Sequence, residues 1–189
     1  MQFILASGSP RRRDLLHRAG FEFDLRVADV EEIPKANEAP EDFARRAAQD
    51  KAMTVAATVP NDSLVLGADT VVVIDSQIHG KPRDNQDAYR MLQTLSGRTH
   101  RVITGVCLVR APGTIEAERV ETTQVTFRSL DEAEIRQYIS SGEPSDKAGA
   151  YAIQGLASKF VTRISGCYFN VVGLPVPLVY ELLKPFIDA

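Results

Sequence analysis

The sequence predicts an α/β protein whose mixed, twisted sheet is flanked by helices. Apolar strand segments alternate with amphipathic helical segments, and two long β-rich runs follow each other as a hairpin. The hairpin strands span residues 99–110 and 115–127 and are joined through Ala111-Pro-Gly-Thr. A length of 189 residues suits a single domain, residues 1–189, made of two lobes that share one core.

The other elements follow from local patterns. Pro10 suits the first position of a helix with Ser9 as its N-cap, and Gly20 ends that helix. A nearly continuous apolar run from Leu64 to Ile74 is typical of a strand covered on both faces. The remaining expected strands are 3–6, 21–27 and short pieces within 146–166, and the expected helices are 10–19, 41–59, 84–95, 131–139 and 175–187.

Composition limits the classes of function. The chain has 22 basic and 25 acidic residues, a balance too even to indicate nucleic acid or an anionic membrane as the main partner. No apolar stretch approaches the roughly 18 residues of a membrane span, and the first residues do not resemble a signal peptide. We therefore expect a cytoplasmic protein, with Cys107 and Cys167 as small buried residues in a reducing compartment rather than zinc ligands.

Familiar catalytic signatures are absent from the sequence. No serine lies in a Gly-x-Ser-x-Gly elbow, and no Gly-x-Gly-x-x-Gly or Walker loop is present. The three histidines, His17, His79 and His100, have no partner at a useful spacing. These observations disfavour a serine hydrolase, a dinucleotide-binding enzyme and a P-loop NTPase.

A candidate anion site lies where the first strand gives way to the first helix, at Ser7-Gly-Ser-Pro-Arg-Arg-Arg. Helix-start N–H groups, serine hydroxyls and guanidinium groups are the components of such a site. The alternative is a capped helix with solvated arginines. Because successive positions point in different directions around a helix, we do not expect Arg11, Arg12 and Arg13 all to face one ligand.

Asp69 is the candidate for chemistry, because it lies inside the most hydrophobic strand of the chain, followed by Thr70. A buried carboxylate is costly, so either the strand reaches a cleft here or a cation meets Asp69. A loop hydrogen bond is the plainer alternative. Lys81 and Arg83 follow in a tight basic segment, and a carboxylate with nearby cations is what metal-assisted phosphoryl chemistry needs.

Lys51 lies along one edge of the 41–59 helix, beside its apolar stripe. It either snorkels to solvent or extends its ammonium into a cleft towards phosphate. Glu31 and Glu32 are either a solvated acidic pair or a source of carboxylate ligands for a metal.

Taken together, these segments resemble the Maf family of nucleotide pyrophosphatases over nearly the whole chain and in the same order. The resemblance is carried by Leu5-Ala-Ser-Gly-Ser-Pro-Arg-Arg-Arg, Gln49-Asp-Lys-Ala, Leu66-Gly-Ala-Asp-Thr-Val-Val, Gly80-Lys-Pro-Arg-Asp, Leu95-Ser-Gly-Arg-Thr-His, Ser141-Gly-Glu-Pro-Ser-Asp-Lys-Ala-Gly-Ala-Tyr-Ala-Ile-Gln-Gly and Val172-Gly-Leu-Pro. It departs from the family pattern at Gln49-Asp-Lys and in the variable stretch Cys167-Tyr-Phe-Asn170. It implies a Maf/ITPase-like fold with two lobes around a nucleotide cleft.

The resemblance also implies roles for individual residues. Asp69 matches the family's catalytic acid/base, and Arg11, Thr70 and Gln154 match positions associated with substrate choice. The polar residues that match the family's cleft are Ser7, Arg12, Glu32, Lys51 and Lys81. It further implies a divalent cation, Mg²⁺ or Mn²⁺, held near Asp69 and Glu32, and a homodimer.

The activity implied is hydrolysis of a nucleoside triphosphate to its monophosphate and pyrophosphate, a house-cleaning role. Ala-Asp-Thr together with Ala-Tyr-Ala-Ile-Gln-Gly resembles the subgroup acting on dTTP and UTP. Two alternatives stay open at this point. One is a related enzyme for 7-methyl-GTP or another modified or damaged nucleotide, and the other is a nucleotide-binding regulator of septum formation.

Overall fold

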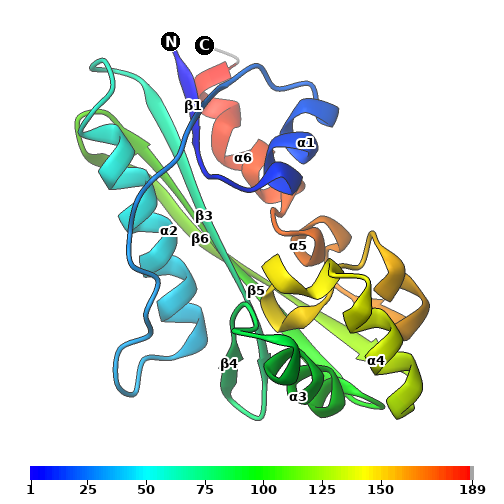
Figure 1. Ribbon diagram of the computed structural model, residues 1–189. Coiled ribbons are helices and arrows are strands. Elements are labelled where there is room, and N and C mark those ends of the chain that lie inside the picture. The colour runs from blue at the N-terminus through cyan, green and yellow to red at the C-terminus, as the bar shows by residue number, and fades with distance from the viewer. Residues whose placement is uncertain (188–189) are drawn as a thin grey trace. The chain divides into compact units, whose positions relative to one another are not determined.

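The computed structural model describes residues 1–187 and confirms the mixed α/β architecture (Figure 1). The strands are β1 (Phe3–Ala6), β2 (Asp24–Arg26), β3 (Leu64–Ile74), β4 (Gln77–His79), β5 (Thr99–Arg110), β6 (Thr114–Phe127) and β7 (Val161–Ser165). They form one sheet in the order β2-β1-β3-β5-β6-β7, with β4 paired to β3. Because β1 pairs in parallel with β2 and β3 whereas β6 and β7 are antiparallel, the sheet is mixed.

The helices are α1 (Pro10–Arg18), α2 (Pro40–Ala56), α3 (Asn85–Leu95), α4 (Glu132–Ser140), α5 (Tyr168–Val172) and α6 (Val176–Ile187). Three 3-10 turns complete the described chain: η1 (Glu143–Asp146), η2 (Ala148–Ala150) and η3 (Leu156–Phe160). Within residues 1–187, no helix has both the length and the apolar character that crossing a membrane requires.

Several helix ends follow from capping contacts, of which the sequence predicted the one at Ser9. The backbone N–H of Arg12 donates to the Ser9 hydroxyl at the start of α1, with Pro10 in the first turn. Asp131 forms a capping box with Glu134 at the start of α4. The α2 helix ends at Ala56, earlier than residue 59, because the Thr58 N–H bonds the Val55 carbonyl three residues back instead of continuing the α-helical pattern.

Two stretches differ from the expectation. Residues 146–166 contain the 3-10 turns η2 and η3 and one strand, β7, because Gly149 and Gly166 adopt positive φ values of 66° and 123° that interrupt extended backbone. The β2 strand is confined to Asp24–Arg26, while the Phe21 ring packs edge-on against Phe3. The short elements β4 and α5 were not predicted.

The chain divides into two compact units. Unit 1 comprises residues 1–70, residues 104–121 and the segment from Gly173, and unit 2 comprises residues 71–103 and 122–172. Three strands, β3, β5 and β6, contribute residues to both units. The expectation of a single domain of two lobes with one core stays a prediction.

The core of unit 1 joins α2 to one face of the sheet. Its fully buried members are Ile4, Ala6, Ala48, Ala52, Val55, Ala56, Val65, Cys107, Val109 and Ala111. Side chains alternate across a strand, so Leu5, Leu66 and Leu108 point to the opposite face. Figure 1 shows α1 and α6 on that side of β1, with α2 on the other.

The core of unit 2 is aromatic and contains a buried histidine. His100 Nε2 lies 2.8 Å from the Tyr151 hydroxyl, and both rings pack edge-on against Phe127. Burial lowers the pKa of His100 to about 4, so the imidazole is neutral in the folded protein.

Acid should therefore destabilise the protein through His100. An unfolded histidine binds a proton near pH 6.5 but the folded one does so only near pH 4, so stability present above pH 6.5 is lost as the pH falls between these values. This difference corresponds to about 2 kcal/mol between pH 7 and pH 5. Urea unfolding at both pH values should show a smaller loss for His100→Gln, whereas His17→Gln, at an exposed site, should match the wild type. An equal loss in both variants would contradict the assignment.

Candidate functional site

Two glycines allow α2 to lie unusually close to the sheet beside Asp69. A Cβ at Gly67 would lie 2.1 Å from the Ala48 carbonyl oxygen, and one at Gly105 would lie 2.1 Å from that of Ala44. No residue larger than glycine fits at either place without displacing the helix. Gly67 and Asp69 lie two positions apart on β3, so both side-chain positions face α2.

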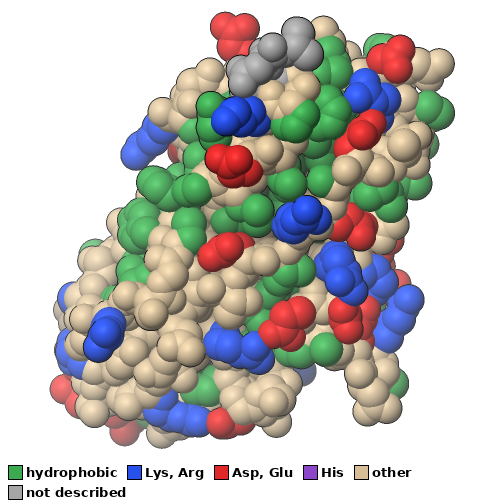
Figure 2. Space-filling view, turned by 180° about the vertical axis from the view of Figure 1, so that it is seen from behind, with side chains coloured by type: hydrophobic (Ala, Val, Ile, Leu, Met, Phe, Trp, Pro, Cys, Tyr) green, Lys and Arg blue, Asp and Glu red, His purple; other side chains and the backbone are tan. Residues whose placement is uncertain are grey.

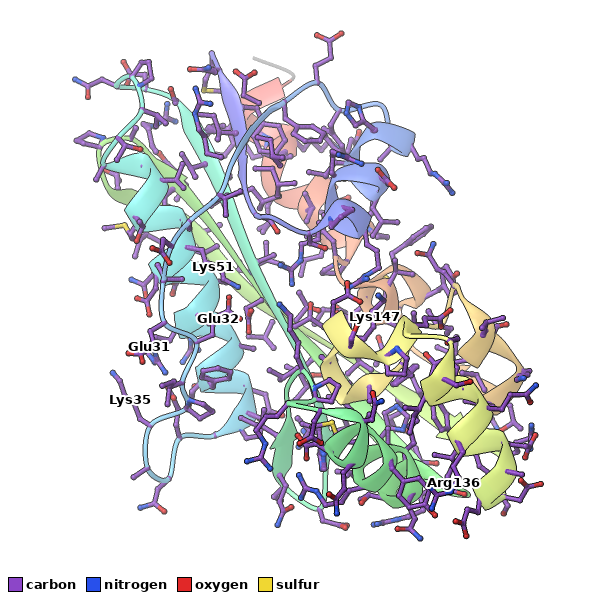
Figure 3. The ribbon with its side chains drawn as sticks, viewed as in Figure 1. Glu31, Glu32, Lys35, Lys51, Arg136 and Lys147 are labelled. Carbon is purple, nitrogen blue, oxygen red and sulfur yellow. The ribbon has the colours of Figure 1, made fainter. Side chains whose placement is uncertain are left out.

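Lys51 extends from α2 to Asp69. Its Nζ lies 2.6 Å from Asp69 Oδ1 and 2.7 Å from Glu32 Oε1, and the lysine side chain is only 8% exposed. Figure 3 shows Glu32, on the loop between β2 and α2, close to Lys51 on α2. The snorkelling interpretation of Lys51 is therefore wrong, and a cation meets the carboxylate in the apolar strand.

Opposing effects act on the Asp69 carboxyl. Burial raises its pKa above the usual range, while the positive charges of Lys51 and Arg12 act to lower it. The direction that we infer is upward, because the carboxyl is 5% exposed and desolvation is the largest effect. A carboxyl whose pKa is raised above its usual range accepts a proton more readily, as a general base must.

Arg12 is the buried member of the arginine triplet. Its Nε donates to the Gly173 carbonyl at 2.8 Å, Nη1 donates to Ser7 Oγ at 3.3 Å and Nη2 donates to Thr70 Oγ1 at 3.0 Å. Burial lowers the pKa of its guanidinium, against the raising effect of the Asp69 and Glu32 charges.

The triplet diverges as its helical spacing predicts. Arg13 is exposed and pairs with Asp14 at 3.2 Å, and Arg11 is half-buried on α1. The buried Ser7 hydroxyl receives two hydrogen bonds, from Arg12 Nη1 and from the Ser9 backbone N–H. The segment after β1 thus holds both capping contacts and a buried cation.

Two groups that bond to Arg12 and Thr70, the Thr104 hydroxyl and the Gly173 carbonyl, were missed by the sequence interpretation; together with the predicted residues they form one cluster. Thr104 Oγ1 lies 2.9 Å from Thr70 Oγ1, and the Gly173 carbonyl accepts from both Arg12 and Thr70. A threonine in the otherwise apolar run Val102-Ile-Thr-Gly-Val could have signalled the first, because a buried hydroxyl needs a partner. A backbone carbonyl leaves no such signal.

The cluster lies wholly within unit 1. It contains the predicted residues Ser7, Arg12, Glu32, Lys51, Asp69 and Thr70. Lys81 and Gln154 belong to unit 2, where both side chains are exposed, and their roles stay predictions. Arg83 pairs with Asp87 at 3.3 Å within unit 2.

Glu32 and Asp69 are the two carboxylates of the cluster that could together bind a small divalent cation. Among the described residues, no group of three or more histidine, cysteine, aspartate or glutamate side chains gathers as a metal site. Oxygens of Glu32 and Asp69 nevertheless converge on a single cationic atom, Lys51 Nζ. One or two carboxylates completed by substrate phosphates is the usual protein contribution to a Mg²⁺ site, so these residues fit such an ion.

The surface carries no concentration of one charge on the face that Figure 2 presents, where acidic and basic side chains are interspersed. This is the pattern expected from a net charge of −3. Lys51 and Arg12, the cations of the site, are buried and do not belong to this surface.

Comparisons with known proteins agree with the sequence pattern. The dTTP/UTP pyrophosphatase of Koribacter versatilis is 52% identical over 184 residues, covering 97% of this chain and 94% of that protein. The dTTP/UTP pyrophosphatase of Vibrio cholerae is 50% identical and covers 98% of both chains. That of Salmonella typhimurium is 48% identical, covering 96% of this chain and 91% of that protein.

Among solved structures, a nucleoside-triphosphatase / dITP/XTP pyrophosphatase from Mycobacterium abscessus matches with a TM-score of 0.41 and 15% identity, over 69% of this chain and 76% of that one. This likeness is too low to carry a conclusion. The family model for Maf-like proteins matches residues 2–186, nearly the full length. With relatives at about half identity over the same span, the chain belongs to the Maf family.

Proposed function

We propose that this protein is a nucleoside triphosphate pyrophosphatase that hydrolyses dTTP and UTP to the monophosphate and pyrophosphate. The observation that carries the proposal is the buried Asp69 carboxylate, which accepts from Lys51 at 2.6 Å, while Arg12 donates to the neighbouring Thr70 at 3.0 Å. Relatives at 48–52% identity are named dTTP/UTP pyrophosphatases. The proposal includes a house-cleaning role, with modified pyrimidine nucleotides as further substrates.

Asp69 is the general base in this mechanism. It orients a water molecule and accepts its proton while the water oxygen forms a bond to the α-phosphorus. The bond between the α-phosphorus and the bridging oxygen breaks, and pyrophosphate leaves with the electron pair. The raised pKa of Asp69 favours this proton transfer, because the conjugate acid is then stable enough to form.

The cations offset the negative charge that grows on the phosphate oxygens. The positive charge comes from Lys51, Arg12 and Lys81. Each such contact with a phosphate oxygen is typically worth about 3–4 kcal/mol in the transition state. Ser7 has a matching role as a donor. Its oxygen already accepts two hydrogen bonds from the protein, so its O–H proton remains to donate to a phosphate oxygen.

Glu32 and Asp69 would hold the divalent cation, Mg²⁺ or Mn²⁺. When bound, such an ion neutralises phosphate charge and orients the triphosphate. The support for this part of the proposal is the convergence of one oxygen from each carboxylate on Lys51 Nζ.

A nucleotide panel tests the proposed substrate. Purified protein is incubated with Mg²⁺ and dTTP, UTP, dCTP, dATP, GTP or 7-methyl-GTP, and the monophosphate and pyrophosphate are both measured. We expect kcat/KM for dTTP and UTP to exceed the purine values by a factor on the order of 10² or more, since unpaired buried polar groups penalise the wrong base strongly. Preference for 7-methyl-GTP would reassign the substrate, and binding without turnover would favour the regulator of septum formation.

Base selection is proposed for Arg11, Thr70 and Gln154, with Thr70 acting through the shape of its side chain because its hydroxyl already bonds Arg12, Thr104 and the Gly173 carbonyl. The Gln154 amide offers both a donor and an acceptor, which a pyrimidine edge requires. In Gln154→Leu, we expect the ratio of dTTP to GTP turnover to fall by roughly tenfold or more, because hydrogen bonds to the base are lost. A uniform loss for every nucleotide would contradict base reading. The exposed Gln137→Leu serves as the control.

The proposed setting is the cytoplasm, where nucleoside triphosphates are made and used, and the proposed assembly is a homodimer. Both follow from the family resemblance rather than from a contact in the chain. Sedimentation at micromolar concentration distinguishes a monomer of 20.8 kDa from a dimer of twice that mass.

A further inference from the structure

Thr104 is a buried polar residue to which the proposed reaction has so far given no role. It lies on β5, its side chain is 0% exposed, and its hydroxyl oxygen is 2.9 Å from that of Thr70. Within residues 1–187, this is the hydrogen bond that the Thr104 side chain makes. A buried hydroxyl on an apolar strand needs such a partner, because leaving it unpaired would cost stability.

The direction of that hydrogen bond follows from counting protons around Thr70. Its oxygen has one proton and two acceptor positions. Arg12 Nη2 can only donate to it, at 3.0 Å, and the Gly173 carbonyl can only accept from it, at 3.2 Å. If the Thr70 proton goes to Gly173, Thr104 must donate to Thr70, and every group is then satisfied. The reverse arrangement would leave the Thr104 proton buried without an acceptor.

Thr104 thus fills the second acceptor position of Thr70, and Arg12 fills the first. The four residues form a closed set, because the Gly173 carbonyl also accepts from Arg12 Nε at 2.8 Å. Three of them, Thr70, Thr104 and Gly173, are end residues of the segments that make up unit 1. Thr70 also directly follows Asp69 on β3.

We propose that Thr104 is a positioning residue, whose hydroxyl holds Thr70 and thereby the Arg12 guanidinium in the arrangement used for pyrophosphate release. This inference rests on the proposed function. A methyl group in place of the hydroxyl cannot remain 2.9 Å from the Thr70 oxygen, because carbon contacts are optimal at about 3.5–4.0 Å. Thr70 must then move, and Arg12 loses one of its acceptors.

The test compares Thr104→Val, Thr104→Ala and Thr104→Ser with the wild type. We expect the Val and Ala variants to lose roughly tenfold or more in kcat for dTTP with a smaller change in KM, and Ser to restore kcat. Thr123→Val is the matched control, since Thr123 is also 0% exposed but bonds to Cys167 within unit 2. It should lower thermal stability without the selective loss of kcat.

A second readout needs no turnover. The Arg12 Nε–H resonance in a ¹H–¹⁵N spectrum, identified from its loss in Arg12→Lys, should shift in Thr104→Val and return in Thr104→Ser. An unshifted resonance in Val, or wild-type kcat in both Val and Ala, would overturn the inference. A wild type that releases no pyrophosphate from any nucleotide would instead overturn the proposed function, and the positioning role with it.

Discussion

Asp69→Asn is expected to lower kcat for pyrophosphate release from dTTP by about 10²–10⁴-fold, because an amide cannot accept the proton of the attacking water. The side chain keeps its shape, and its oxygen can still accept from Lys51, which also retains Glu32 at 2.7 Å. Folding should therefore survive. Steady-state release of monophosphate and pyrophosphate by the purified variant measures the effect.

The exposed carboxylate Asp75 provides a matched control. It pairs with Arg98 at 2.6 Å in unit 2, and Asp75→Asn makes the same chemical change outside the cluster. We expect its kcat to equal that of the wild type. Retained turnover in Asp69→Asn, after contaminating activity has been excluded, would contradict the role of Asp69 as general base.

The dependence of kcat/KM on pH should test the role of Asp69 as general base independently. A base must be ionised to act, so kcat/KM falls as the pH drops through the pKa of Asp69. Because burial raises that pKa, the acid limb should lie above pH 3.8, the ordinary value for an aspartate. An acid limb at or below that value would mean that the base is a solvated carboxylate.

Lys51→Met is the second large effect that we expect. Loss of the ammonium removes charge stabilisation from the phosphate oxygens, which typically lowers kcat by about 10²–10³-fold. It also removes one of the two cations that lower the pKa of Asp69. The acid limb of kcat/KM should therefore move to higher pH than in the wild type.

Lys51→Met should also lower the free energy of unfolding, and the pH dependence of this loss should identify the uncompensated Asp69 carboxylate as its cause. Removing one partner of a buried ion pair typically costs about 3–5 kcal/mol, because the other charge is left uncompensated. In Lys51→Met, the pKa of folded Asp69 rises further above its unfolded value, so the deficit is largest at high pH. It shrinks as the pH falls through the folded pKa and Asp69 becomes neutral.

Urea unfolding at pH 8 and pH 5 measures this difference between the variant and the wild type. The control is Lys35→Met, which alters an exposed lysine of the same unit. A deficit in Lys51→Met that is equal at both pH values would indicate lost packing of the lysine stem rather than an uncompensated carboxylate.

Much of the fold could be predicted because local signals agreed with one another. The apolar run of β3 indicated its bounds, and Ser9 marked the start of α1. Residues 146–166 were predicted poorly, because glycines there signal interruption without specifying whether strands or 3-10 turns lie between them.

The candidate site was predictable where a residue was out of place in its own element. Asp69 lies in an apolar strand and Lys51 lies beside an apolar stripe, so each needed a partner of opposite charge. The two side chains form an ion pair with each other. The choice between snorkelling and burial of Lys51 depended on how closely α2 approaches the sheet. That approach depends on Gly67 and Gly105, whose importance appears only when helix and sheet are seen together.

Thr104 and Gly173 lay beyond sequence reasoning for another reason. They act through hydrogen bonds between segments far apart in the chain, from Arg12 to Thr70 and Gly173 and from Thr104 to Thr70. Such contacts are set by tertiary packing and leave little trace in local patterns.

The most direct test of the account is the position of oxygen from water in the products. Hydrolysis of dTTP in H₂¹⁸O followed by mass spectrometry shows which phosphorus the water attacked. Attack at the α-phosphorus by water activated at Asp69 predicts ¹⁸O in the monophosphate and none in pyrophosphate. Label in pyrophosphate, or release of inorganic phosphate and dTDP instead, would contradict the proposed reaction.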